Sequence, residues 1–449
     1  MRVTIFLIAV FLLSSFLMPL RVYGNYTNTI TINNDGSVSP SDAPLTTTDN
    51  ITYTLTDNVT KDVLGIKIER SNVILFGQGY TIQGQDSGSG IYATNENNIT
   101  LIGFRIKDFN IGININSSSN GLINNNTITS MTLGIQLSAC NNSSITQNNI
   151  DNCAHALDLP YSSDIVVSKN RIVSDPLGIS LPTSSTINIT ISENSFFGDS
   201  SIGGYGIIGL SCSRVNVLKN YFTSEACGVQ FFSGYNNTVS FNNMTKNRQA
   251  ALLALNSAYN IVSYNFMVNN SEGLAIQTSS NNNRIFRNII DGNKDYGVFI
   301  GWSSSNNTVF ENNLTRNLYG IFLNGSRTNV FVHNNIANNN QSAVTYDSFN
   351  DTWDTGFDGN YWSDYNGTDN DQDGIGDTSY VVNTNNTDHF PLMTPYPIPE
   401  YPSILILSFF FMTTLFGLIL YRRRYLLRSS KKDRSLSKTE YILIQTNQD

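Results

Sequence analysis

The feature that most constrains this chain is an internal repeat of about 22 residues. A pattern hydrophobic-x-x-Asn-x-hydrophobic recurs through its middle part, with 22 to 26 residues between successive asparagines. These asparagines are Asn126, Asn148, Asn170, Asn194, Asn220, Asn242, Asn265, Asn288, Asn312 and Asn334. Phe104 holds the equivalent position before the first of them, and Asn360 the one after the last. A repeat of this length indicates a solenoid of stacked units.

A second pattern lies between the asparagines and identifies the units as strands. It reads small-hydrophobic-x-hydrophobic, as in Gly134-Ile135-x-Leu137 and Gly320-Ile321-x-Leu323. Alternation with a period of two, in segments rich in Ile, Val and Phe, is typical of short strands. The predicted fold is therefore all-β: a right-handed parallel β-helix of about 12 coils. With coils about 4.8 Å apart, it forms a rod of about 55 Å.

The repeated asparagine is predicted to have a structural role. Two residues separate it from the preceding inward hydrophobic residue, so the chain turns a corner there. Asparagine tolerates the left-handed conformation that such a corner can need. Its amide can also donate to one neighbouring coil and accept from the other. We therefore expect an asparagine ladder inside the rod and no catalytic role for these residues.

Apolar segments near both ends predict export and a single membrane span. Residues 1–24 resemble a signal peptide, and the 19 residues of 403–421 carry no charge and are followed by Arg422, Arg423 and Arg424. The β-helix is then outside the cell and the C-terminus in the cytoplasm. The predicted parts are a signal peptide (1–24), an N-terminal cap (25–62), β-helix repeats (63–356), a C-terminal cap (357–397), a linker (398–402), a transmembrane helix (403–421) and a basic tail (422–449).

Composition narrows the classes of partner. The formal net charge of −8 and the isoelectric point near 4.9 argue against binding to nucleic acid. The four cysteines, Cys140, Cys153, Cys212 and Cys227, form no C-x-x-C motif, and buried thiols are favoured over disulfides. Nineteen Asn-x-Ser/Thr sequons, among them Asn188 and Asn269, predict a glycoprotein if the host modifies exported chains.

Two stretches resemble a known family. The sequence from Gly65 to Gly84 resembles the opening coils of NosD-type β-helix proteins, which share the pectin-lyase-like fold. The segments 359–365 (GNYWSDY) and 388–392 (DHFPL) resemble the closing part of that family, notably in archaeal surface members. The resemblance implies the fold. It leaves the function open, because the family name comes from accessory proteins linked to copper delivery, and β-helices also serve as lyases, hydrolases, adhesins and spacers.

Catalytic and copper chemistry are not favoured by the residues present. Copper requires His, Met or Cys side chains close together, but 178 residues separate His155 from His333, and the remaining histidine is His389. A glycosidase requires two neighbouring carboxylates. Glu193 and Glu311 instead alternate with basic residues in the position before the ladder, so we expect structural ion pairs there.

Carbohydrate binding makes smaller demands on the sequence. Amides are frequent at outward positions, and Tyr161 and Trp302 occupy the same turn position, with Tyr235 and Tyr259 in nearby turns. We expect these four aromatic residues to bind sugar. The predicted function is recognition of a polysaccharide or cell-surface glycan, or structural display, by a membrane-anchored β-helix. A polysaccharide lyase or hydrolase and a copper-related accessory protein are the alternatives.

One acidic segment matches a calcium-binding loop in part. Asp369, Asp371, Asp373 and Asp377 occupy loop positions 1, 3, 5 and 9, with glycine at position 6. Position 12 is Tyr380, where an EF-hand has glutamate. The spacing predicts a Ca²⁺ ion that holds the C-terminal cap together.

Overall fold

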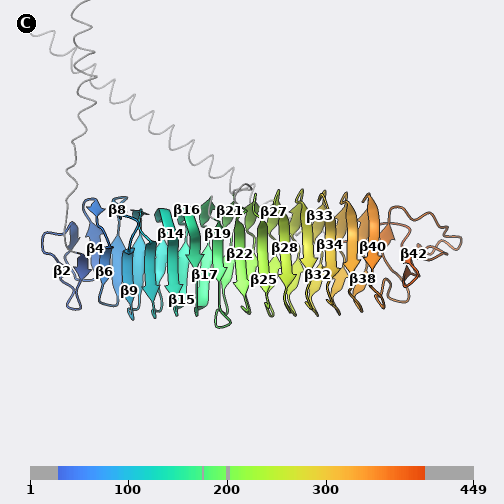
Figure 1. Cartoon of the computed structure of the whole chain (residues 1–449), viewed down its shortest axis with the longest axis horizontal. Coiled ribbons are helices and arrows are strands. Elements are labelled where there is room, and N and C mark those ends of the chain that lie inside the picture. Colours follow the sequence, from blue (N-terminus) through green and yellow to red (C-terminus); the bar gives the residue numbers. More distant parts are fainter. Residues whose placement is uncertain (1–28, 174–175, 199–202, 400–449) are drawn as a thin grey trace, which may run out of the picture. The chain divides into compact units, whose positions relative to one another are not determined.

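The computed structural model describes residues 29–173, 176–198 and 203–399. The predicted signal peptide and transmembrane helix lie outside these residues, so export and anchoring stay predictions. Among the described residues, no helix has the length and apolar character needed to cross a membrane. The described chain is a parallel β-solenoid whose coils stack side by side, for example from β6 (Leu64–Ile68) to β40 (Gln341–Tyr346) (Figure 1).

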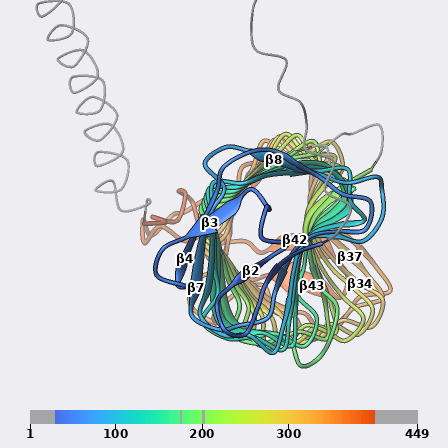
Figure 2. The ribbon, with the colours of Figure 1, turned by 90° about the vertical axis from the view of Figure 1, so that its left-hand side faces the viewer.

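Each coil contributes strands to three rows, which form the walls seen end-on in Figure 2. The first row follows the corner that holds the ladder asparagine in the coils from Asn126 onward: β5 (Val59–Thr60), β8 (Thr81–Gln83), β11 (Arg105–Lys107), β18 (Arg171–Val173), β21 (Ser195–Phe197), β24 (Tyr221–Thr223), β27 (Asn243–Thr245), β30 (Phe266–Val268), β33 (Ile289–Asp291), β36 (Asn313–Thr315), β39 (Asn335–Ala337) and β41 (Tyr361–Trp362). The second row comprises β1 (Ile30–Ile32), β6 (Leu64–Ile68), β9 (Ser89–Thr94), β12 (Ile111–Asn116), β19 (Leu177–Leu181), β22 (Tyr205–Leu210), β25 (Cys227–Phe232), β28 (Gln249–Ala254), β31 (Glu272–Ile276), β34 (Tyr296–Gly301), β37 (Tyr319–Asn324) and β40 (Gln341–Tyr346).

Two long strands, β14 (Thr127–Ser138) and β16 (Asn149–Asp158), run through both of these rows and join them into one 27-stranded sheet. The third row is a 14-stranded sheet. It comprises β3 (Leu45–Thr47), β4 (Thr52–Leu55), β7 (Val73–Phe76), β10 (Ile99–Ile102), β13 (Leu122–Asn124), β15 (Asn141–Thr146), β17 (Ser163–Ser168), β20 (Thr190–Ser192), β23 (Asn216–Leu218), β26 (Thr238–Ser240), β29 (Ile261–Ser263), β32 (Arg284–Phe286), β35 (Thr308–Phe310) and β38 (Val330–Val332).

The number of turns is about fourteen, two more than the repeat pattern predicts. The additional turns lie before residue 63, where β1 pairs in parallel with β6 and β4 with β7. These first coils lack a ladder asparagine, which is why the pattern does not reveal them. The antiparallel strands β2 (Val38–Ser39) and β3 cover the beginning of the solenoid.

Inward side chains of successive coils form columns in the core. One column of the third row is buried throughout, each member no more than 1% exposed, and consists of Ile123, Ile145, Val167, Ile191, Val217, Val239, Val262, Ile285 and Val309. Each side chain packs on its equivalent one coil away, so the hydrophobic spacing fixes the register of the whole stack.

The asparagine ladder runs along one inner corner. Asn148 donates from its backbone N–H and from Nδ2 to Oδ1 of Asn170, at 2.9 and 3.0 Å. Its Nδ2 also donates to the carbonyl of Ile123 in the preceding coil, at 2.9 Å. The same scheme joins the other members, from Asn126 to Asn360. From Asn148 onward, every amide oxygen accepts from the asparagine of the preceding coil. The N–H donors of the last asparagine therefore need an acceptor beyond the last coil.

We expected the asparagine to have the left-handed conformation at this corner. The structure instead gives that conformation to the residue before it. Positive φ values near 55–60° occur there in coil after coil, even at Phe241 and Tyr264. The ladder asparagine itself does not have a positive φ. The asparagine can therefore direct its amide inward while the preceding residue makes the turn. Even bulky residues adopt the strained positive φ at that preceding position, because hydrogen bonds to the neighbouring coil fix the backbone.

Two further ladders were not predicted. One contains Asn237, Asn260, Asn283, Asn307 and Asn329, and ends at Asp351. The other contains Asn247, Asn270, Asn293, Asn317 and Asn339. The chain is so rich in asparagine that these residues do not stand out in the sequence, although they follow the same period.

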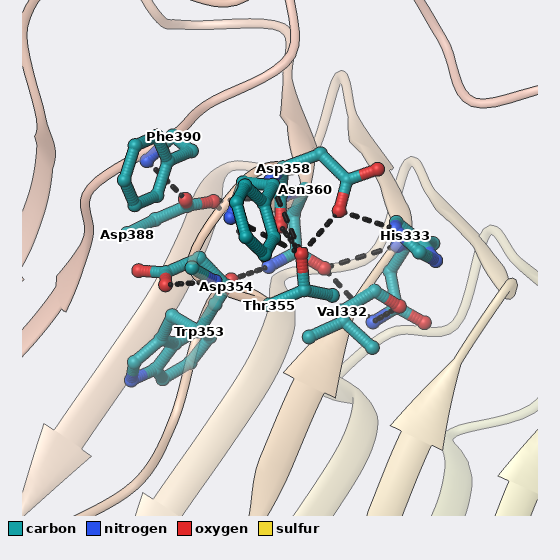
Figure 3. A network of polar contacts seen from close by, with 12 residues as sticks. Val332, His333, Trp353, Asp354, Thr355, Asp358, Asn360, Asp388 and Phe390 are labelled. Carbon is teal, nitrogen blue, oxygen red and sulfur yellow. Dashed lines mark hydrogen bonds and ion pairs between the residues drawn. The ribbon is translucent and has the colours of Figure 1, made fainter.

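Asp388 closes the C-terminal end of the first ladder (Figure 3). It lies in β43 (Asn386–Asp388), which pairs with β42 (Tyr380–Asn383), and it is fully buried. Its carboxylate accepts from the N–H of Asn360 at 2.8 Å and from the N–H of Phe390 at 3.1 Å. Trp362 Nε1 donates to it as well, at 2.8 Å. The two segments of the closing motif thus meet at this carboxylate.

Candidate functional site

The outer surface of the second strand row changes character along the rod. One outward column there contains, in order, Tyr92, Asn114, Gln136, Asp158, Ser180, Ile208, Gln230, Leu252, Ala275, Phe299, Phe322 and Val344. It is polar from Asn114 to Ser180 and predominantly apolar from Ile208 onward. Leu252, Ala275 and Phe299 are buried although they point out of the solenoid, and with Cys227 and Ala254 they form a second hydrophobic cluster outside the core.

Six aromatic side chains make this region an extended apolar surface. We call it the outer aromatic cluster, and it consists of Tyr296, Phe299, Trp302, Tyr319, Phe322 and Tyr346. Phe299 is central: its ring centroid lies 5.2 Å from that of Tyr296 and 5.7 Å from those of Trp302 and Phe322. Trp302 and Tyr346, at the edge, are more than half exposed. A contiguous apolar surface of this kind is a candidate interaction site.

A groove of about 340 Å³ adjoins the cluster on its N-terminal side. It is lined by Tyr205, Ala226, Cys227, Gln230, Arg248, Gln249, Leu252, Glu272, Gln277, Tyr296 and Trp302. Tyr296 donates from its hydroxyl to Glu272 Oε2 at 2.6 Å, across neighbouring coils. Burial raises the pKa of the Tyr296 hydroxyl, and the hydrogen bond to Glu272 raises it further. Tyr296 therefore stays protonated and holds the Glu272 carboxylate in a fixed position.

Of the four aromatic residues predicted to bind sugar, the structure places Trp302 in the groove. Tyr235 and Tyr259 contact each other elsewhere, with ring centroids 5.3 Å apart, and Tyr161 is 62% exposed on an earlier coil. Tyr296, Phe299, Tyr319, Phe322 and Tyr346 were not predicted. An alignment of the coils by their outward positions, in place of the search for turn residues, places Phe299 beside Phe322 in one column and Tyr296 beside Tyr319 in another.

The acidic loop of the C-terminal cap gathers three of its four predicted ligands. Oxygen atoms of Asp369, Asp371 and Asp373 lie within 4.8 Å of one another. Asp369 accepts from the N–H groups of Asp373 and Gly374, at 3.2 and 3.1 Å, which shapes the loop around its carboxylate. Asp377 Oδ2 instead accepts from the backbone N–H of Asn370 at 2.9 Å.

The structure also places the histidines and cysteines considered for copper. His155 is exposed on β16. His333 Nε2 lies 3.0 Å from Asp358 Oδ1, and His389 Nδ1 lies 2.9 Å from Asp354 Oδ2. Within the described ranges, the one group of three or more His, Cys, Asp or Glu side chains close enough to share an ion is that of Asp369, Asp371 and Asp373. Three carboxylates suit hard cations and do not fit copper.

The four cysteines are buried and are not bonded to one another as disulfides. Burial raises the pKa of the Cys212 thiol to about 12 and also raises the pKa values of Cys140 and Cys227. Thiols of this kind are not nucleophilic at neutral pH. Cys227 lines the groove as an apolar residue.

Comparison with protein families identifies two matching segments. Residues 30–196 match the family described as right handed beta helix region, and residues 199–367 match the family described as periplasmic copper-binding protein (NosD). The boundary between them coincides with the change in the outward column. Both segments therefore carry β-helix family domains, and the groove and the outer aromatic cluster belong to the NosD-like part. No match was found among the curated proteins.

Solved structures with partial likeness are carbohydrate-active β-helix enzymes. The periplasmic alginate epimerase AlgG is 14% identical over 69% of this chain and 80% of its own, with a TM-score of 0.40. The DFA-IIIase of Arthrobacter chlorophenolicus A6 is 16% identical over 62% and 81%, with a TM-score of 0.43. The mannuronan C-5 epimerase AlgE6 A-module of Azotobacter vinelandii is 14% identical over 67% and 88%, with a TM-score of 0.43. Likenesses this distant transfer no activity to this chain.

Proposed function

We propose that the protein recognises a carbohydrate with the groove and the outer aromatic cluster. The supporting observation is the combination of exposed aromatic rings with amides on one outer face. The C–H faces of a pyranose ring are apolar and stack on rings such as those of Trp302 and Tyr346. The sugar hydroxyls donate to and accept from the side chains of Gln230, Gln249 and Gln277, which have both functions. Apolar walls with a few placed polar groups are typical of small-molecule sites.

The charges in the groove favour an uncharged sugar. Arg248 and Glu272 both line it, so neither sign predominates. Glu272 is the one carboxylate among the lining residues, and its Oε2 accepts from Tyr296. Recognition therefore has more support than hydrolysis, which requires a second carboxylate at a defined separation. We accordingly propose a binding role on a rigid scaffold.

Tryptophan fluorescence tests this proposal directly. The chain has three tryptophans, and Trp353 and Trp362 are 1% exposed whereas Trp302 is 53% exposed. Titration of the full-length protein with soluble neutral oligosaccharides and, separately, uronate oligosaccharides is expected to change the Trp302 emission with the neutral set. Trp302→Asn should remove both the change and the binding measured by calorimetry. Asparagine is chosen because residue 302 has a φ of 55°, which asparagine tolerates.

Tyr161→Asn is the matched control. Tyr161 occupies the same turn position, has a φ of 58° and lies outside the groove. This variant should bind as the wild type does. Equal loss of binding in both variants, or no binding of any member of the panel, would contradict the proposed site.

We also propose that the loop of Asp369, Asp371 and Asp373 binds Ca²⁺. Three carboxylates with oxygen atoms within 4.8 Å repel one another unless a cation lies between them. Oxygen ligands of this kind are those that Ca²⁺ prefers. The role proposed for the ion is to stabilise the cap beyond the last coil. Elemental analysis of the purified protein, with the melting experiment described in the Discussion, tests it.

A further inference from the structure

The second asparagine ladder ends on a carboxylate that takes the place of an asparagine. Asp351 Oδ1 accepts from the backbone N–H of Asn329 at 2.8 Å and from its Nδ2 at 3.1 Å. This repeats the contacts that Asn329 Oδ1 receives from Asn307 one coil earlier, both at 3.1 Å. Through its Oδ1, Asp351 thus accepts the same two hydrogen bonds as a ladder asparagine.

The other carboxylate oxygen stands where a ladder asparagine has a donor. Two and three coils earlier, Nδ2 donates backward to a backbone carbonyl: Asn307 to that of Ser280 and Asn283 to that of Ser257, each at 3.0 Å. The same register assigns the carbonyl of Ser326 to Asp351. Asp351 Oδ2 is buried and has no hydrogen-bond partner among the described residues. An ionised oxygen cannot donate to a carbonyl, whereas a protonated one can.

In the part of the chain that the structure describes, no neighbouring charge compensates the carboxylate. Arg327 lies over the ring of Phe349 at 5.2 Å, Asp354 pairs with His389, and Asp347 is exposed. Burial raises the pKa of Asp351 to about 6, against the opposing effect of the Asn329 donors, and no charged group contributes to the shift. Burial also raises the pKa of Asp388, but both of its oxygens accept hydrogen bonds, from Asn360, Trp362 and Phe390, whereas Asp351 Oδ2 has no partner among the described residues.

We propose that Asp351 is a proton-binding site that closes the second ladder, with its protonated Oδ2 donating to the carbonyl of Ser326. The last coil is then tight when Asp351 is protonated and loosens when it ionises. The pKa of Asp351 is about 6 in the folded state and 3.8 in the unfolded chain, so protonation stabilises the folded state. This stabilisation is complete below pH 3.8 and is lost as the pH rises through about 6. Asp351 lies two residues before Trp353, whose indole Nε1 donates to Asn386 Oδ1 in the cap hairpin at 3.1 Å, so loosening of the last coil extends to the cap.

Hydrogen exchange on the full-length protein between pH 4.5 and 7.5 tests the proposal. After correction for the intrinsic exchange rate, opening of the segment around residues 345–360 should increase roughly thirtyfold over this range, which is the part of the effect of a pKa raised from 3.8 to about 6 that falls between pH 4.5 and 7.5. The segment 216–240, in mid-rod, is the internal control and should not change. Asp351→Asn restores the ladder donor and should remove the part of the pH dependence that Asp351 causes, leaving any part caused by Asp388, whose pKa is also raised by burial. The same pH dependence in the wild type and in Asp351→Asn would overturn the proposal.

Direct titration of the carboxyl group gives a second and independent readout. The ¹³C shift of the Asp351 carboxyl carbon in the wild type, assigned by its loss in Asp351→Asn, should titrate with a midpoint near 6. This measurement decides the question even if Asp351→Asn disorders the last coil at every pH. A midpoint near the usual value for aspartate would overturn the proposal.

Discussion

Trp362 and Asp388 are joined by a hydrogen bond of 2.8 Å, from the indole Nε1 to the carboxylate, in a region where both side chains are buried. The two residues come from the last strand of the solenoid and from the hairpin beyond it. Asn360, the last member of the first ladder, donates to the same carboxylate oxygen. Asp388 is therefore the point at which the ladder, the last coil and the cap are held together.

Replacement of Asp388 is expected to loosen this end of the protein. Asp388→Ala leaves the N–H groups of Asn360, Phe390 and the Trp362 indole without an acceptor, and each buried unpaired donor costs about 1–3 kcal/mol. We expect the free energy of unfolding of the last coil to fall by at least about 3 kcal/mol. Asp388→Asn, which retains one acceptor oxygen, should lose less. Local hydrogen exchange measures both, and equal losses would contradict this role.

Gly359 is predicted to be irreplaceable for the same reason. A Cβ atom at this position would lie 2.0 Å from Asp388 Oδ1, and Asp388 cannot move without breaking the four hydrogen bonds that its carboxylate accepts. Gly359→Ala should lower the melting temperature of the cap, at a cost of about 1–3 kcal/mol or more. Gly121→Ala is the control, since its closest contact would be 3.2 Å, to the Ser143 hydroxyl. A cap that melts normally in Gly359→Ala would refute the packing argument.

The core column gives a prediction about the stacking of coils. Val239→Asp places an unpaired charge at a position that is 1% exposed, which costs several kcal/mol. The neighbouring coils should unfold with it, because each coil is stabilised by the next. Thr238→Asp, on the outward side of the same strand, is the control and should have little effect on circular dichroism melting. Similar melting curves for the two variants would mean that the assigned orientation is wrong.

Calcium is expected to stabilise the cap. At a hundredfold excess over Kd, a bound ion adds about 2.7 kcal/mol to the free energy of unfolding. Thermal melts with calcium and with chelator should differ in the wild type and coincide in Asp371→Asn. Asp377→Asn separates two arrangements: a normal response to calcium indicates three carboxylate ligands, and a lost response indicates four. No response in the wild type, with no calcium by elemental analysis, would leave the loop as an acidic turn.

The sequence is most informative where one residue type repeats at one position. The parallel solenoid and the first ladder follow from the spacing of residues such as Asn126 and Asn148, because each coil imposes the same requirement on the next. The number of turns was underestimated because the first coils are held by ordinary hydrophobic pairs, such as Ile30 beside Ile66.

The candidate site is less visible in the sequence because it depends on neighbours in different coils. The contact between Tyr296 and Glu272 joins residues 24 positions apart, and neither residue stands out within its own repeat. Asp388 is a similar case: its partners lie 26 and 28 residues earlier, beyond the last complete repeat. Such pairs become evident only when the register between coils is known.

The ladders have a consequence for the length of the molecule. Each coil packs on the next through the same asparagine hydrogen bonds and the same core side chains. A coil can therefore pack on any other coil that has these residues at equivalent positions. Removal or duplication of one whole unit, for example the 23 residues 243–265, retains both kinds of contact across the new junction. The distance between the two caps can therefore change in steps of about 4.8 Å. The length of the solenoid can thus differ by whole coils elsewhere in the stack while the residues of the groove and of the outer aromatic cluster stay the same.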